Sequence, residues 1–176
     1  MSGILSHVRP AFIAGAAFIL GASYVLPADA QTPPASPAPA AATTGPSPSR
    51  SAIEARRAVF ALIGSNFRPL GDVLKGNKSY DAAEVQKRIS RIIFLSEFLD
   101  ESFPDVSNTG LPDTKTKADA WTNKDDFAKK IKSFQDASLA LQKVNAAEKG
   151  ATDAFKASLA ALGQECKGCH DNYKEK

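Results

Sequence analysis

The C-terminal stretch at residues 152–173 reads TDAFKASLAALGQECKGCHDNY, a pattern typical of one long helix. Thr152 is a residue type that caps helix N-termini, and the apolar side chains after it are spaced by three or four positions. This spacing predicts an amphipathic helix whose inward face carries two cysteines and one histidine. The residues of that face are Phe155, Leu159, Leu162, Cys166, Cys169, His170 and Tyr173.

An earlier helix is predicted from Ser51, which forms a capping-box pattern with Glu54. In this pattern the hydroxyl and the carboxylate bond free backbone N–H groups at a helix start. Pro69 is expected to disturb the last turn, because proline has no N–H to donate. The apolar stripe of this helix is Ile53, Phe60, Ile63, Phe67, Leu70 and Leu74.

Two more helices lie between these segments. Asp81 and Glu84 repeat the capping signal, and the helix that they start is expected to end at Phe103–Pro104. A loop at about residues 103–122 precedes the next helix, which is expected to end at Lys149–Gly150. The two apolar stripes are Val85, Ile89, Ile92, Leu95 and Leu99, and Phe127, Ile131, Phe134, Leu141 and Val144.

The four periodic segments predict an all-α fold, because no segment shows strand alternation of useful length. Four helices with one apolar stripe each bury those stripes most simply as an antiparallel up-down four-helix bundle. The loop at about residues 103–122 is long enough to run along such a bundle.

The N-terminal residues are expected to be an export signal followed by a tether. Residues 1–30 combine a basic start, an apolar run and the triplet Ala28-Asp29-Ala30, which is the plan of a cleaved signal peptide. A permanent membrane anchor is the weaker alternative, because the run falls short of the ~18 residues of a spanning helix. Residues 31–49 are expected to be a Pro/Ala-rich disordered tether, and residues 50–176 the bundle domain, exported to the periplasm of a Gram-negative host.

The composition excludes some classes of function. With 22 basic and 19 acidic residues, the net charge of +3 is too small for the basic surface that phosphate-backbone binding needs, so no nucleic-acid partner is expected. Two cysteines cannot build the disulfide framework of a small secreted scaffold. Because Cys166 and Cys169 are only three positions apart, they are expected to act together at one site.

Residues 166–170, Cys-Lys-Gly-Cys-His, form the C-x-x-C-H pattern of c-type haem attachment. Thiols at Cys166 and Cys169 lie one helical turn apart and can add to the two vinyl groups of a haem, while His170 reaches the iron. We therefore predict one covalently attached haem c per chain, inside the bundle near the C-terminal helix, with His170 as metal ligand.

Three other interpretations of the motif compete with haem attachment. A dithiol–disulfide pair normally lies at a helix start after a strand, whereas here the pattern closes a helix. A structural zinc site needs four ligands, and residues 31–176 offer two cysteines and one histidine. Chance occurrence is the third, although all cysteines and the only histidine of that region fall in this pentapeptide.

The usual strong sixth ligands of an electron-carrying haem are missing. Beyond residue 30 the sequence holds no methionine and no second histidine, although lysine, tyrosine and asparagine remain conceivable ligands. We predict a five-coordinate, high-spin iron with an apolar vacant face that admits NO or CO.

Arg56, Arg57 and Phe60 are the candidate pocket residues of the first helix. Arg56 falls on the apolar stripe, where burial of a cation needs an anionic partner such as a haem propionate. The alternative is that Arg56 extends past the helix edge to water. Arg57 is expected at the surface or the pocket rim, and Phe60 over the vacant iron face or simply in the core.

The chain from Ile53 to Lys176 resembles the cytochrome c′ family of class II c-type cytochromes. The matching residues are Ala55-Arg56, Gly64-Ser65-Asn66-Phe67, Lys75-Gly76, Tyr80-Asp81-Ala82-Ala83, the spacing of Trp121 and Phe127, and Cys166-Lys167-Gly168-Cys169-His170-Asp171. The resemblance implies thioether donors at Cys166 and Cys169, a proximal ligand at His170, a propionate neighbour at Arg56 and a distal occupant at Phe60. The chain departs from the family at Lys174, where an arginine is frequent.

The expected function is electron transfer with periplasmic redox partners, combined with binding of NO or CO. The alternative is a plain electron shuttle with an unexpected sixth ligand and no gas role. An enzyme is not expected, because no distal histidine or glutamate is available to manage protons beside the iron. The family resemblance also implies a homodimer formed through the first two helices.

Overall fold

The computed structural model describes residues 45–176, and within them the chain is helical and contains no strand. The predicted signal peptide and most of the predicted tether lie outside the described residues. The structure confirms the all-α fold. The elements are α1 (Pro48–Leu74), α2 (Ala82–Ser96), a 3₁₀ turn (Glu97–Leu99), a second 3₁₀ turn (Asp105–Ser107), α3 (Asp119–Thr122), α4 (Lys124–Glu148) and α5 (Asp153–Tyr173).

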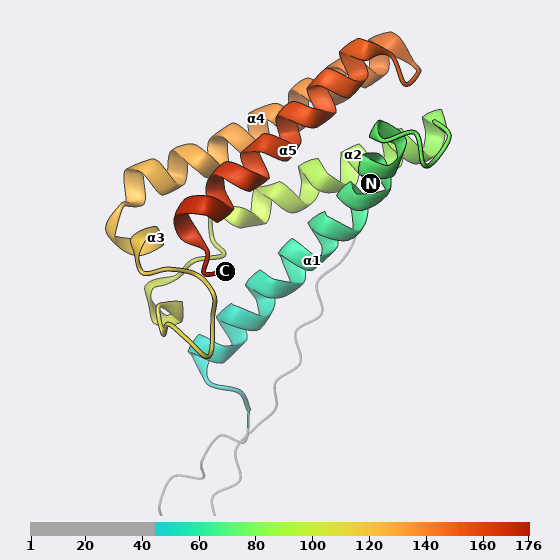
Figure 1. Ribbon diagram of the computed structural model, residues 1–176. Helices are drawn as coiled ribbons and strands as arrows, with labels where there is room; N and C mark the ends of the chain where they lie inside the picture. The colour runs from blue at the N-terminus through green and yellow to red at the C-terminus, as the bar shows by residue number, and fades with distance from the viewer. Residues whose placement is uncertain (1–44) are drawn as a thin grey trace, which may run out of the picture. The chain divides into compact units, whose positions relative to one another are not determined.

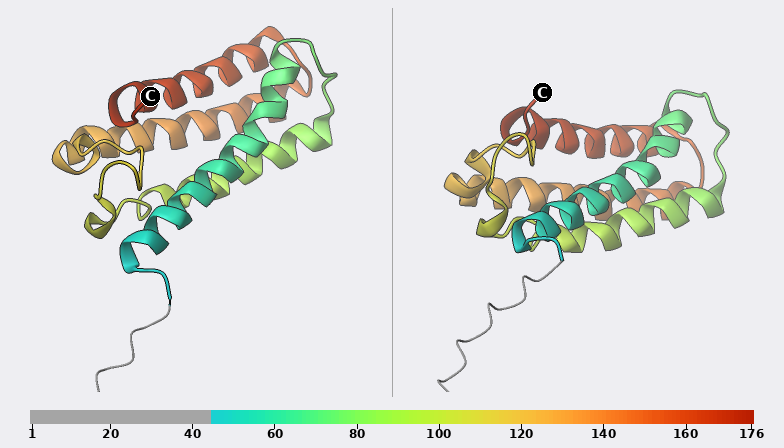
Figure 2. Two further views of the ribbon diagram at one scale, coloured as in Figure 1. Left: turned by 60° about the horizontal axis from the view of Figure 1, so that its bottom comes forward. Right: turned by 90° about the horizontal axis from the view of Figure 1, so that it is seen from below.

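The four long helices form the predicted antiparallel up-down bundle. Helix α1 packs against α2, α2 against α4, and α4 against α5, and successive long helices run in opposite directions (Figure 1). Helices α1 and α5 approach each other less closely along their length, as the turned views also show (Figure 2). The long connection between α2 and α4 lies at the end of the bundle where α5 terminates (Figure 2).

Two of the predicted helix starts are confirmed. The carboxylate of Asp81 accepts a hydrogen bond of 2.7 Å from the Glu84 N–H at the start of α2. The hydroxyl of Thr152 accepts one of 3.2 Å from the Phe155 N–H at the start of α5. Both caps satisfy backbone donors that would otherwise have no partner.

The predicted start of α1 is wrong by one turn. The helix begins at Pro48, and its cap is Ser47, whose hydroxyl accepts a 3.3 Å hydrogen bond from the Arg50 N–H. Proline fits the first helical position because its missing N–H has no helical partner there. Ser51 therefore lies inside the helix rather than at its start.

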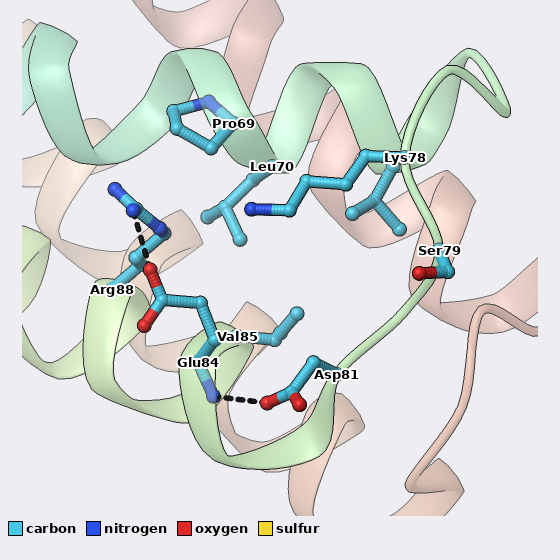
Figure 3. Close-up of a pocket in the computed structure, with 9 residues that line it drawn as sticks. Pro69, Leu70, Lys78, Ser79, Asp81, Glu84, Val85 and Arg88 are labelled. Carbon is cyan, nitrogen blue, oxygen red and sulfur yellow. Dashed lines mark hydrogen bonds and ion pairs between the residues drawn. The ribbon is translucent and has the colours of Figure 1, made fainter.

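Helix α1 continues through Pro69 to Leu74. Pro69 leaves the carbonyl of Ser65 without its usual helical donor, and Nη1 of Arg88 on α2 donates to that carbonyl at 3.2 Å. Figure 3 shows Arg88 paired with Glu84 of the same helix, near the Asp81 cap. The cation of α2 thus supplies the hydrogen bond that the proline removes from α1.

Helix α2 ends earlier than predicted, at Ser96 instead of Phe103–Pro104. The buried hydroxyl of Ser96 donates to the Ile93 carbonyl at 2.7 Å, a local bond that competes with continued helix. The 3₁₀ turn that follows keeps Leu99 in the core.

The core is formed by the predicted stripes of all four long helices, with Phe155, Leu141, Leu159 and Leu162 fully buried. At the far end of the bundle, Asn145 is buried and accepts a 2.9 Å hydrogen bond from the Tyr80 hydroxyl, while its amide donates to Gln86 at 3.0 Å. Within residues 45–176, no helix is both long and apolar enough to span a membrane.

Candidate haem site

A cavity of about 890 Å³ lies between α1, α4, α5 and the connection that follows α2. Its volume is in the range of cofactor and ligand sites in proteins. Apolar side chains form most of its inner wall, among them Ile63, Phe67, Phe127, Ile131 and Phe134. The cavity lies on the side of the bundle formed by α1 and α5, which pack less closely than the other neighbouring pairs of long helices.

The α5 wall carries the motif residues Cys166, Cys169 and His170, as the sequence predicted. Both cysteines are half-buried free thiols. Removal from water raises the pKa of both thiols, and that of Cys169 rises to about 11, with the neighbouring Cys166 contributing. Burial therefore keeps both thiols of the haem-free chain mainly in the neutral form at neutral pH.

His170 faces the cavity from the last turn of α5 and is exposed. Partial removal from water lowers the pKa of its imidazole, and Lys174 lowers it further while Asp171 opposes the shift. A neutral imidazole keeps a lone pair for a metal ion. In the part of the chain that the structure describes, no three His, Cys, Asp or Glu side chains converge as a metal site.

The α1 wall supplies no sulfur, imidazole, amine or carboxylate to the cavity. Phe60 lies on this wall with 37% of its surface exposed, and its ring meets that of Phe103 edge-to-face at 6.2 Å. The α1 residues that line the cavity are Arg56, Arg57, Phe60, Ala61, Ile63, Gly64 and Phe67.

Arg56 is only 3% exposed, so the alternative that it extends to water is wrong. Its guanidinium donates to Ser107 Oγ at 2.8 Å, to Thr114 Oγ1 at 2.9 Å and to the Ser102 carbonyl at 3.3 Å. Removal from water lowers its pKa, and the charge of Arg57 adds to the effect. Among the described residues, no carboxylate forms an ion pair with Arg56.

Two aromatic rings complete the surroundings of Arg56. The guanidinium carbon lies 4.9 Å from the centre of the Phe103 ring and 5.7 Å from that of Trp121, within the range of cation–π attraction. Arg57, by contrast, is exposed at the cavity rim and donates to the carbonyl of Asp113. The prediction that Arg57 lies at the surface or rim is confirmed.

The sequence did not reveal the wall formed by the connection between α2 and α4. Leu111, Pro112, Thr114, Lys115 and Thr116 all line the cavity. This segment has no helical or strand periodicity, so nothing in the sequence indicated which of its side chains point inward. The lining residues Lys130 and Glu165 were missed as well, because charged side chains are ordinarily assigned to solvent.

The residues of the cavity fit a covalently bound haem. Two thiols one helical turn apart and an adjacent imidazole lie on one wall, which matches the donor set of a c-type haem. The apolar interior suits a porphyrin face. Arg56, buried without an anionic partner among the described residues, matches a ligand that carries carboxylates.

Comparisons with known proteins show which family the chain matches. Residues 51–174 match the family model described as Cytochrome C′. A cytochrome c′ of Cereibacter sphaeroides is 32% identical over 126 residues, covering 70% of this chain and 83% of the relative. One of Pararhodospirillum photometricum is 32% identical over 123 residues and covers 70% of this chain and 95% of the relative.

Solved structures are similar as well. Cytochrome c prime from Shewanella frigidimarina has a TM-score of 0.66 and 38% identity, covering 75% of this chain and 100% of that one. A nitric oxide complex of a variant of cytochrome c prime from Alcaligenes xylosoxidans has a TM-score of 0.66 and 26% identity, covering 73% and 97%. A carbon monoxide-bound variant of the latter protein has a TM-score of 0.65, with 26% identity and the same coverage.

Proposed function

Because this chain belongs to the cytochrome c′ family, we propose that it is an exported c-type haem protein that transfers electrons and binds NO or CO. The observation that carries the proposal is the cavity itself. Its α5 wall presents two thiols and an imidazole, and its α1 wall presents no side chain able to ligate iron. The NO and CO complexes of similar structures support the gas ligands.

Cys166 and Cys169 would hold one haem through thioether bonds, and His170 would bind the iron from the same wall. The haem supplies an iron that changes oxidation state and has a coordination position for a small ligand. With haem bound, the apolar residues of α1 and α4 would limit the access of water to the iron. Arg56 and Arg57 would offer positive charge to the carboxylates of the haem.

Phe60 is proposed to cover the face opposite His170. A phenyl ring cannot bind iron, and it restricts the space for an incoming ligand. An apolar cover favours small neutral molecules over water and anions, since a charged group loses hydration on entering such a site. This preference is the physical basis of the proposed selectivity for NO and CO.

A plain electron shuttle is the second candidate function, and one observation favours it. Lys115 and Lys130 line the cavity from elements other than α5 and carry amine nitrogens that can bind iron. If one of them occupied the sixth position, the iron would be low-spin and gas binding would be suppressed. Neither role requires enzymatic turnover.

Export to the periplasm, use of periplasmic redox partners and assembly as a homodimer are further parts of the proposal. The signal-like residues 1–30 support export. Leu62 on α1 and Phe94 on α2 are 51% and 59% exposed, which supports a self-association surface on these two helices. Sedimentation of the purified protein measures the oligomeric state.

The proposal is tested on the purified protein by absorption and electron paramagnetic resonance spectra, oxidised and reduced, with and without NO. We expect high-spin spectra and NO binding to the reduced protein. A low-spin spectrum without NO binding would favour the shuttle.

Covalent attachment of the haem has its own test. A variant with both Cys166→Ala and Cys169→Ala should release its haem on denaturation, because no thioether bond then holds it. Gln164→Ala is the matched control, since Gln164 is exposed on the same helix and lies outside the cavity wall. The control should retain haem on the denatured chain. Haem that stays bound to the denatured double variant would contradict attachment through these two thiols.

A further inference from the structure

The segment at residues 102–117, here called the strap, forms one wall of the proposed haem site although it has little regular structure. It contains one 3₁₀ turn, Asp105–Ser107, and otherwise follows an irregular path. Leu111 and Pro112 are largely exposed and line the cavity. Irregular segments move readily unless side chains fix them, so the position of this wall depends on its attachments.

The strap is attached to α1 through Arg56 at three points along its length. Nη1 of Arg56 bonds Ser107 Oγ and the Ser102 carbonyl, and Nη2 bonds Thr114 Oγ1. Ser107 and Thr114 are 0% and 3% exposed, so these bonds are shielded from water. Hydrogen bonds from a charged donor in such surroundings are the stronger kind.

The C-terminal end of the strap is also attached to the end of α5, directly after the haem motif. The Lys117 N–H donates to the Tyr173 carbonyl at 2.9 Å, and the Glu175 N–H donates to the Lys115 carbonyl at 2.7 Å. Thr116 and Lys174 form an isolated antiparallel bridge at the same place. The strap therefore links α1 to α5, the neighbouring pair of long helices that packs least closely in the bundle.

We infer that Arg56, Ser107 and Thr114 are positioning residues that lock the strap and thereby set the separation of the α1 and α5 walls of the ligand cavity. Arg56 does this through neutral acceptors, so its role is separate from any contact with haem carboxylates. The inference rests on the proposed haem site for its effect on ligand access. The attachment of the strap by these three side chains involves only the protein and does not depend on bound haem.

The Thr114→Val variant of the haem-loaded protein tests this inference, since it removes the acceptor and keeps the shape of the side chain. Thr109→Val is the matched control, because Thr109 is exposed in the same strap and lies outside the cavity wall. We expect amide hydrogen exchange at Lys117 and Glu175 to become about tenfold faster or more in Thr114→Val, because Thr114 Oγ1 accepts hydrogen bonds both from Arg56 and from the Thr116 N–H. CO association should become about threefold faster or more.

Thr114→Ser should restore both rates, because it retains the hydroxyl. The inference is overturned if Thr114→Val matches Thr109→Val in exchange and in CO association. It is also overturned if Thr114→Val lowers only the unfolding midpoint, which is the signature of a purely structural bond. A wild-type protein without a haem spectrum would overturn the proposed function instead, and the exchange comparison would still decide whether the strap is locked.

Discussion

Substitutions at Phe60 and Phe155 distinguish an effect on ligand entry from an effect on the stability of the bundle. Phe60 lies on the cavity wall and is 37% exposed, whereas Phe155 is 0% exposed and lies outside that wall. Phe155 packs edge-to-face on Tyr80 at 5.5 Å, in the half of the bundle where Asn145 is buried. The same substitution at these two positions therefore perturbs different properties.

Phe155→Ala should lower the free energy of unfolding by about 3–5 kcal/mol, the usual cost of deleting a fully buried ring. Phe60→Ala should lower it by about 2 kcal/mol or less, because over a third of the residue's surface is already exposed. Urea unfolding of both variants measures these values.

CO association should respond in the opposite order. Loss of the Phe60 ring opens space on the α1 wall, and we expect association at least about tenfold faster, equal to about 1.4 kcal/mol of the barrier. Phe155→Ala should leave the rate within about twofold of the wild-type value, under conditions where both proteins are folded. Flash photolysis of the CO complex measures both rates, and equal rates in the two variants would show that Phe60 does not cover the ligand path.

Two further predictions concern stability and titration. Asn145→Ala should lower the free energy of unfolding by about 1–3 kcal/mol, because it leaves the half-buried Tyr80 hydroxyl and Gln86 amide oxygen without their partner; an unchanged urea midpoint would contradict this. The hydrogen bond to Asp126, together with burial, raises the pKa of Tyr173 to about 12. The contribution of this hydrogen bond to stability is therefore complete below about pH 10, the ordinary pKa of tyrosine, and is lost as the pH rises through about 12. Tyrosine ring-carbon NMR shifts should show this late ionisation, and Tyr173→Phe should abolish it.

Local rules explain why most of the fold could be predicted. Apolar spacing identified the four long helices, and the side chains of Asp81 and Thr152 cap α2 and α5 as expected. The rules failed where two local signals competed. Ser51 with Glu54 satisfies the capping pattern, but Ser47 before Pro48 provides a cap one turn earlier.

The haem motif was accessible to sequence analysis for a similar reason. Cys166, Cys169 and His170 lie within five consecutive residues, so helical geometry alone brings them to one face. The absence of methionine and of a second histidine beyond residue 30 is a property of composition. Both points hold without knowledge of how the helices pack.

The sequence by itself thus determined the four long helices, though not all of their ends, the placement of Cys166, Cys169 and His170 on one face of α5, and the lack of methionine and of a second histidine beyond residue 30. The tertiary structure decided what surrounds Arg56, since its partners Ser102, Ser107 and Thr114 are 46 to 58 positions away in the chain. It also decided that the irregular strap closes one side of the cavity. Such contacts follow from the path of the connection after the bundle has formed, and no periodic pattern in the sequence encodes that path.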